Sequence, residues 1–186
     1  ARLGLRSNLC YEVSDRDGEQ SRVDGITENI EFIKSCSAKK DDMLKGLFGL
    51  HASMTVSDKT LEESMELMSG LDAGYHVHVA EGIEDLEDSR AKYGMGVVER
   101  WHTHGVLGPK SIAIHCIHIS EKEMDLLKAS DVAVAHNPES NMGNAVGLSP
   151  VHKMMEKGIL VGLGTDGYTS DMFDSYKVAN CLHKHR

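Results

Sequence analysis

The chain alternates six short apolar runs with longer stretches of helical periodicity, and this alternation limits the fold more than any other feature. The apolar residues in each run are nearly continuous, which is typical of strands buried on both faces of a parallel sheet covered by helices. The runs are Leu3–Tyr11, Leu47–Ala52, Tyr75–Ala80, Ser111–Ile119, Val132–Ala135 and Ile159–Gly164. The sequence therefore predicts an α/β fold.

Amphipathic stretches between the runs carry helix start and stop signals. Ser120 precedes EKEMDLL as an N-cap, with Glu123 three residues further on, and glycines stand where helices should end. The stretches are Asp24–Lys40, Asp58–Gly70, Asp85–His104, Glu121–Ser130 and Pro150–Lys157, with a last helix starting near Ser170. The pattern is six βα units.

Length and the position of polar residues favour a barrel over an open sheet. The 186 residues give about 31 per unit, close to a barrel repeat, whereas a complete (β/α)₈ barrel has about 250 residues. A polar residue follows every run, and only a barrel brings six strand ends to one mouth. These residues are Arg16, His51, His78 with Glu81, His115, His136 with Asn137, and Asp166. We expect a single domain over residues 1–186, a partial TIM barrel.

Composition excludes several classes of function. A formal net charge of −9 argues against general binding to nucleic acid or anionic lipid. No apolar run approaches the roughly 18 residues of a membrane span, and no signal peptide opens the sequence. The four cysteines stand singly, without a disulfide framework. We expect a cytoplasmic protein without nucleic-acid or membrane partners.

The segment HVHVAE, residues 76 to 81, is the most informative for chemistry. His76 and His78 share one face of a strand, and neutral imidazole at a strand end is a preferred ligand of zinc or iron. Glu81, three residues later, can approach the open position of a metal from a turn. The alternative interpretation is a pair of core histidines followed by an exposed glutamate.

Other strand ends are ambiguous when taken singly. Asp166 in LVGLGTDG could serve a site or only cap a helix, and His115 within SIAIHCIHI is more typical of a core residue. His51 and His136 could line a pocket or lie in turns. The closely spaced pairs His102/His104 and His183/His185 follow no apolar strand, so we expect them to be solvated.

Taken together, these residues are the components of metal-assisted hydrolysis. A metal ion lowers the pKa of water toward about 7, and a nearby glutamate can transfer the proton to a leaving amine. The candidates for this chemistry are His78, Glu81, His115 and Asp166.

At these positions the sequence resembles the amidohydrolase superfamily, in the branch of cytosine, guanine and S-adenosylhomocysteine deaminases and triazine chlorohydrolases. HVHVAE resembles the strand-five element, AIHCIHIS the strand-six element, HNPESNM the strand-seven element and GLGTDGYTS the strand-eight element of that branch. LCYEVSDRDG and the HKH tail resemble SsnA-type aminohydrolases. The resemblance covers essentially the whole chain.

The resemblance implies a role for each matched residue. His78 and Asp166 would bind one divalent metal ion, zinc or alternatively iron, and Asp166 would also act as a base. Glu81 would shuttle the proton between water and the substrate nitrogen, and His115 would hydrogen-bond the nucleophile or the substrate. His51 stands where dinuclear relatives place a bridging lysine, which implies a single metal. Residues expected to contact the substrate are His51, Asn141, Ser170 and Arg16.

One departure from the family pattern matters. The family's first two metal ligands come from a His-x-His at the end of strand one, and no such motif precedes Leu3. The six units then correspond to strands three to eight of the family barrel. We therefore expect a fragment of a longer parent chain, inactive alone, whose parent could form a homodimer.

The expected reaction is hydrolytic deamination of a cyclic amidine or nucleobase-like ring, a small heterocyclic substrate. Two alternatives remain open at this point. One is a chlorohydrolase or amide hydrolase of the same superfamily, and the other is a non-catalytic barrel that serves as a binding module.

Overall fold

The computed structural model describes residues 4–39 and 42–184 and has the α/β fold that the sequence predicts. The strands are β1 (Ser7–Leu9), β2 (Glu12–Val13), β3 (Leu44–Gly46), β4 (Phe48–Leu50), β5 (Tyr75–Val79), β6 (Ile112–His115), β7 (Ala133–His136) and β8 (Val161–Leu163). The helices are α1 (Glu19–Lys39), α2 (Asp58–Met68), α3 (Ile83–Tyr93), α4 (Val97–Thr103), α5 (Glu121–Ala129), α6 (Pro138–Gly143), α7 (Val151–Glu156) and α8 (Met172–Leu182), with a 3₁₀ turn at Ser53–Thr55. Among the described residues no helix is both long and apolar enough to cross a membrane.

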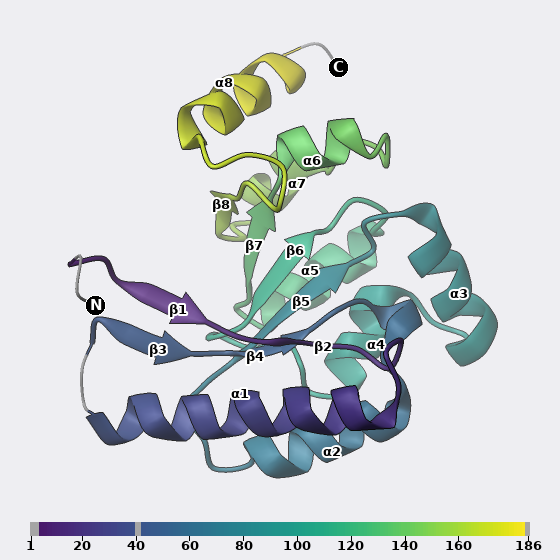
Figure 1. Cartoon of the computed structure of the whole chain (residues 1–186). Coiled ribbons are helices and arrows are strands. Elements are labelled where there is room, and N and C mark those ends of the chain that lie inside the picture. The colour runs from purple at the N-terminus through teal and green to yellow at the C-terminus, as the bar shows by residue number, and fades with distance from the viewer. Residues whose placement is uncertain (1–3, 40–41, 185–186) are drawn as a thin grey trace.

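Six strands form one sheet in the order in which they occur along the chain, β2-β4-β5-β6-β7-β8, and every pair is parallel. Parallel neighbours need a crossover connection, and helices supply it between successive strands (Figure 1). Strands β1 and β3 pair with each other in a separate two-stranded parallel ladder. Sequential parallel order is the arrangement of consecutive barrel strands, as expected from the sequence.

The first unit differs from the expected single strand over Leu3–Tyr11. Leu3 lies outside the described residues, and the strand is divided into β1 and β2, with β2 ending at Val13. The β3–β4 strand is divided in the same way and starts at Leu44, earlier than predicted. The extension past Tyr11 brings Glu12 into the sheet.

Two helix predictions were wrong. The stretch Asp85–His104 forms two helices, because Gly94 ends α3 in the left-handed region at φ 70° and Gly96 starts α4. The polar segment after His136 is in none of the predicted helical stretches, yet it forms α6, whose first residue is Pro138. Ser120 caps α5 as predicted, and its hydroxyl accepts a hydrogen bond from the Glu123 amide.

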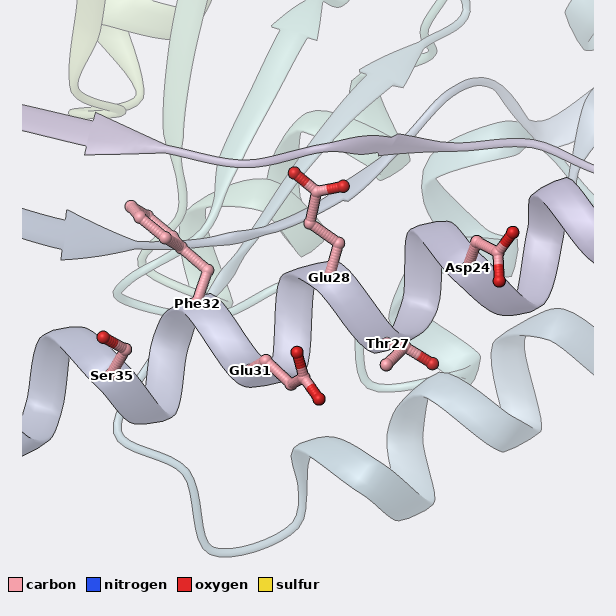
Figure 2. A pocket seen from close by; sticks show the side chains of 6 residues that line it. All are labelled: Asp24, Thr27, Glu28, Glu31, Phe32 and Ser35. Carbon is pink, nitrogen blue, oxygen red and sulfur yellow. The ribbon is translucent and has the colours of Figure 1, made fainter.

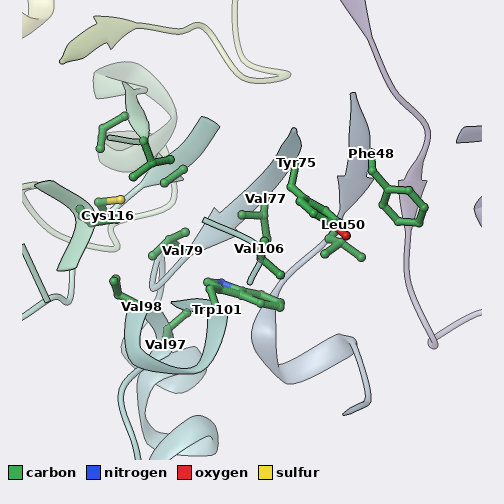
Figure 3. Close-up of a cluster of buried hydrophobic side chains, with 14 of the residues drawn as sticks. Phe48, Leu50, Tyr75, Val77, Val79, Val97, Val98, Trp101, Val106 and Cys116 are labelled. Carbon is green, nitrogen blue, oxygen red and sulfur yellow. The ribbon is translucent and has the colours of Figure 1, made fainter. Parts of the chain in front are cut away.

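The hydrophobic core fills the layer between the sheet and its helices. Figure 3 shows Val77 and Val79 of β5 facing the α4 side chains, where Trp101 is fully buried. Each buried side chain of this size contributes about 1.5–3 kcal/mol. The Trp101 indole N–H also donates to the carbonyl oxygen of His78 at 3.3 Å, so this core residue contacts the backbone of a candidate metal ligand.

Candidate metal centre

Strand alternation assigns the side chains of β5 to two faces. Tyr75, Val77 and Val79 are buried in the helix-covered layer, whereas His76 and His78 are half-buried on the opposite face. We call the face that carries His76 and His78 the inner face. The prediction that these two histidines share a face is confirmed.

Three predicted residues meet at the carboxyl ends of the strands and form what we call the Glu81 cluster: Glu81, His115 and Asp166. The His115 Nε2 atom lies 3.5 Å from Glu81 Oε2 and 3.6 Å from Asp166 Oδ2. Glu81 follows β5, His115 ends β6 and Asp166 follows β8. Three segments far apart in the sequence therefore supply one imidazole and two carboxylates to a single place.

The backbone turns sharply at two of these residues. His115 has φ 68° and Asp166 has φ 55°, in the left-handed region that residues other than glycine rarely occupy. Such a conformation costs about 1–3 kcal/mol and occurs mainly where the surroundings enforce it for a function. Strict alternation along β6 would place His115 on the face of Ala113, away from the inner face. The turn explains how it reaches Glu81 and Asp166.

The tautomer of His115 follows from its partner. Its Nδ1 atom lies 2.8 Å from Asn141 Oδ1, and an amide oxygen can only accept, so Nδ1 carries the proton. Burial lowers the pKa of His115, opposed by the Asn141 hydrogen bond and the charge of Glu81, and the imidazole is neutral at pH 7. The lone pair is then on Nε2, which is buried without a hydrogen-bond partner among the described residues.

Helix α6 supports both carboxylates. The Ser140 hydroxyl donates to Asp166 Oδ2 at 2.7 Å, and the Asn144 side-chain amide donates to Glu81 Oε1 at 3.2 Å. Although partial burial acts in the opposite direction, the hydrogen bonds from Ser140 and the Gly167 amide hold the pKa of Asp166 below its ordinary value. Ser140 and Asn144 were not predicted from the sequence. They are four residues apart and follow Pro138, and this spacing indicates a helix with one polar face.

His78 lies beside the cluster with its own tautomer fixed. Its Nδ1 atom is 2.8 Å from the backbone carbonyl oxygen of His51, so Nδ1 donates and Nε2 keeps the lone pair. The His78 ring stacks on the His115 ring with centroids 5.5 Å apart. A histidine whose second nitrogen donates to a carbonyl is the usual form of a metal ligand.

A second group lies on the other side of His78. Glu12 Oε2 is 3.8 Å from His78 Nδ1, and Glu12 Oε1 is 3.9 Å from His51 Nε2. His51 Nδ1 contacts the Thr55 hydroxyl at 2.6 Å, and the His51 and His78 rings meet edge to face. Glu12 was missed because the predicted strand ended at Tyr11, although its alternation with Val13 could have indicated it.

The remaining predicted contacts take different positions. Asn141 is buried and bonded to His115, and Ser170 is exposed just before α8. The Arg16 guanidinium is exposed 3.9 Å from Glu12 Oε1, and its Nε donates to the Ser14 hydroxyl. The structure thus brings Arg16 and His51 next to Glu12.

His136 points away from the cluster, into the layer between the sheet and α8. Its Nε2 atom lies 3.1 Å from His183 Nε2, and both side chains line a cavity of about 440 Å³ bounded by α7, β8 and α8. The expectation that His183 is solvated was therefore wrong, because α8 packs it against buried His136. His185 lies outside the described residues. His102 is exposed as expected, and His104 lies 3.6 Å from Asp58.

A surface hollow elsewhere on the molecule has a volume of about 520 Å³. It runs along the outer side of α1 and is lined by Asp24, Thr27, Glu28, Glu31, Phe32 and Ser35 (Figure 2). All six residues come from one helix, and none lies at a strand end. The Glu81 cluster, by contrast, combines residues from three separate segments of the chain.

The chemistry of the donor set fits a divalent metal ion. The ligand atoms of Glu81, His115 and Asp166 all lie within 4.8 Å of one another. The His115 Nε2 lone pair is buried without a partner among the described residues, and His78 Nε2 is free of the carbonyl that fixes its ring. Imidazole nitrogens with carboxylate oxygens are typical zinc or iron ligands.

Sheet order and the position of the cluster define the chain as part of a (β/α)₈ barrel with a histidine–carboxylate site at its mouth. The sequence profile of the Amidohydrolase family matches residues 1–186. The chain is 36% identical over 185 residues to 5'-deoxyadenosine deaminase of Methanothermobacter thermautotrophicus, covering 97% of this chain and 43% of that protein. It is 37% identical over 163 residues to 5-methylthioadenosine/S-adenosylhomocysteine deaminase of Pelotomaculum thermopropionicum, covering 86% and 38%.

Solved structures agree. A zinc-bound adenosine deaminase from Xanthomonas campestris superposes with a TM-score of 0.85 at 27% identity, covering 98% of this chain and 43% of that one. Guanine deaminase from C. acetobutylicum gives a TM-score of 0.86 at 21% identity, covering 96% and 45%, and supports the fold alone. The chain belongs to the amidohydrolase family. It spans less than half the length of the curated relatives that it matches.

Proposed function

We propose that this chain forms part of a metal-dependent hydrolase that deaminates a cyclic amidine or nucleobase-like ring. The observation that carries the proposal is the Glu81 cluster, in which His115 Nε2 faces the carboxylates of Glu81 and Asp166 at 3.5 and 3.6 Å. The deaminase names of the relatives at 36% and 37% identity support the reaction class. A cytoplasmic location and a homodimer remain predictions from the sequence.

The proposed metal site takes His78 and Asp166 from this chain, and the rest of a longer polypeptide would supply the other ligands. One divalent ion, with zinc preferred because a structural neighbour binds it, would lower the pKa of water toward about 7 and so provide a nucleophile at neutral pH. The hydrogen bond from His78 Nδ1 to the His51 carbonyl orients the ring for this role.

Each residue of the cluster has a role in proton transfer. Hydroxide adds to the ring carbon that bears the amine, the carbon–nitrogen bond breaks, and ammonia leaves. Glu81, oriented by Asn144, would take one proton from the water as hydroxide forms and deliver it to the departing nitrogen. Asp166 would accept the proton of the hydroxyl added to the ring carbon, and this proton passes to the ring nitrogen as ammonia leaves. The Ser140 hydroxyl holds Asp166 in place by donating to its Oδ2 atom. His115, with its proton on Nδ1, would hydrogen-bond the nucleophile or the substrate through Nε2.

The test is Glu81→Gln in the full polypeptide that carries this segment, assayed for ammonia release from a panel of aminated purines and pyrimidines. Removal of the general acid should lower kcat by about 10²- to 10⁴-fold while the bound metal is retained. Glu84→Gln is the matched control, because Glu84 is an exposed carboxylate only three residues away. Unchanged turnover in Glu81→Gln, or no ammonia from any substrate, would contradict the proposal.

A further inference from the structure

Glu12 is a carboxylate on the inner face that the proposed proton transfers do not use. Its partner in the ladder is Gly49, and its neighbour Val13 is buried in the helix-covered layer, so Glu12 projects to the same face as His51 and His78. Its side chain is 49% exposed. No described residue donates a hydrogen bond to it, and Arg16, His51 and His78 approach no closer than 3.8 Å.

The hydrogen bonds of His51 make it a second acceptor beside Glu12. The Thr55 hydroxyl donates its proton to the Ala52 carbonyl, so its contact with His51 Nδ1 is one in which the imidazole donates. With its proton on Nδ1, the ring presents the Nε2 lone pair, 3.9 Å from Glu12 Oε1.

A cation is a poor occupant for this place. Glu12, His51 and His78 are close enough to be considered as metal ligands, but the nearest His78 atom to Glu12 is Nδ1. That nitrogen carries a proton donated to the His51 carbonyl, so it has no lone pair to offer. Two acceptors that receive no hydrogen bond from the described residues are instead complementary to a ligand that carries two adjacent O–H or N–H groups.

The distance between the two acceptors and the Glu81 cluster determines where on a ligand the two donor groups must lie. The ring centroids of His51 and His78 are 5.2 Å apart, and those of His78 and His115 are 5.5 Å apart. Two ring-to-ring steps therefore separate His51 from the cluster, and Glu12 lies 3.8 Å from the intervening His78. A ligand whose amine lies at Glu81 reaches Glu12 only with a second ring or a ring substituent.

We propose that Glu12 and His51 form an acceptor subsite that selects substrates with a pair of hydroxyl donors on a substituent of the heterocycle, as in the vicinal diol of a nucleoside sugar. This inference rests on the proposed function and adds a specificity determinant to it. Ring N–H groups of a free base offer the same donor chemistry, and the experiment separates the two sources.

The experiment compares adenosine, 2',3'-dideoxyadenosine and adenine as substrates of the metal-loaded full polypeptide. In Glu12→Gln and Glu12→Ala, kcat/KM for adenosine should fall about 10- to 100-fold, mainly through KM, with little change for the dideoxy analogue. Glu31→Gln on the outer side of α1 is the matched control and should change neither. Equal losses on both nucleosides, or a loss confined to adenine, would overturn the assignment.

Binding measured by calorimetry keeps this inference separate from the proposed function. If the wild type binds adenosine but releases ammonia neither from it nor from any other member of the panel, the proposed function fails, while weaker adenosine binding in Glu12→Ala still supports the subsite. If the wild type deaminates adenosine and Glu12→Ala matches it in KM and in calorimetric affinity, the subsite fails and the proposed function stands. If the wild type neither binds nor deaminates a diol-bearing nucleoside, the subsite is refuted, whereas the proposed function fails only if no aminated heterocycle of the panel releases ammonia.

Discussion

Arg100 fixes the segment that positions His51, and its removal should loosen that segment measurably. The guanidinium is 1% exposed, and its two terminal nitrogens donate to Ser53 O and Oγ, Val56 O and Asp58 Oδ1 at 2.7–2.9 Å. It also lies over the Tyr93 ring at 3.9 Å. Arg100→Met would leave two backbone carbonyls and part of the Asp58 carboxylate without donors.

The magnitude follows from these bonds. A buried acceptor left without a partner costs about 1–3 kcal/mol, whereas the partly exposed Asp58 carboxylate regains water and adds little. The expected loss is about 3 kcal/mol in the free energy of opening residues 53–58, which corresponds to roughly 100-fold faster amide exchange. The amides to follow are Met54, Thr55 and Ser57, which donate to Asp85, Ala52 and Asp15.

Hydrogen exchange read by mass spectrometry on the full polypeptide measures this directly. Arg100→Lys should give an intermediate rate, because one ammonium can satisfy some but not all of the acceptors. Arg90→Met is the matched control, since Arg90 is exposed on α3. Exchange over residues 53–58 within threefold of the wild type in Arg100→Met would refute the reasoning.

Two further predictions concern the histidines. Burial lowers the pKa of His136 to about 4, so on acidification the unfolded chain takes up a proton at this residue before the folded chain does. The free energy of unfolding should therefore be constant above about pH 6.5 and fall by about 3 kcal/mol toward pH 4. Urea unfolding should show a smaller loss in His136→Gln. His78→Asn should lower the metal content of the purified polypeptide, read by elemental analysis, whereas His76→Asn on the same face should retain it; equal loss in both would argue against His78 as the ligand.

The order and type of the strands could be predicted because continuous apolar runs report burial on both faces. Helix limits were less predictable, since Gly94 and Gly96 divide one amphipathic stretch through backbone conformation and leave its periodicity intact. The ladder of the first strand also extends to Val13, past the last large apolar residue of the predicted run. Two-residue strands are set by their partner strand, and a single sequence does not reveal that partner.

For the candidate site, strand-end position was sufficient for Glu81 and Asp166. His115 was ambiguous because alternation along its strand assigns it to the core side, and only the turn at φ 68° reverses this. Ser140 and Asn144 were not predicted because a short polar helix and a loop have similar sequences, and only the contacts in the structure distinguish them. Nothing local distinguishes Glu12 from a solvated glutamate.

The left-handed backbone at His115 and Asp166 lowers the stability of the fold at two residues that the proposed chemistry needs. Glycine would adopt φ 68° at position 115 or φ 55° at position 166 without strain, and the histidine and aspartate found there do so at a loss of stability. Laboratory selection for thermal tolerance alone would therefore favour glycine or asparagine at both positions. A thermostabilised library of this chain would therefore tend to lose the His115 imidazole and the Asp166 carboxylate, unless each round also screened for the reaction.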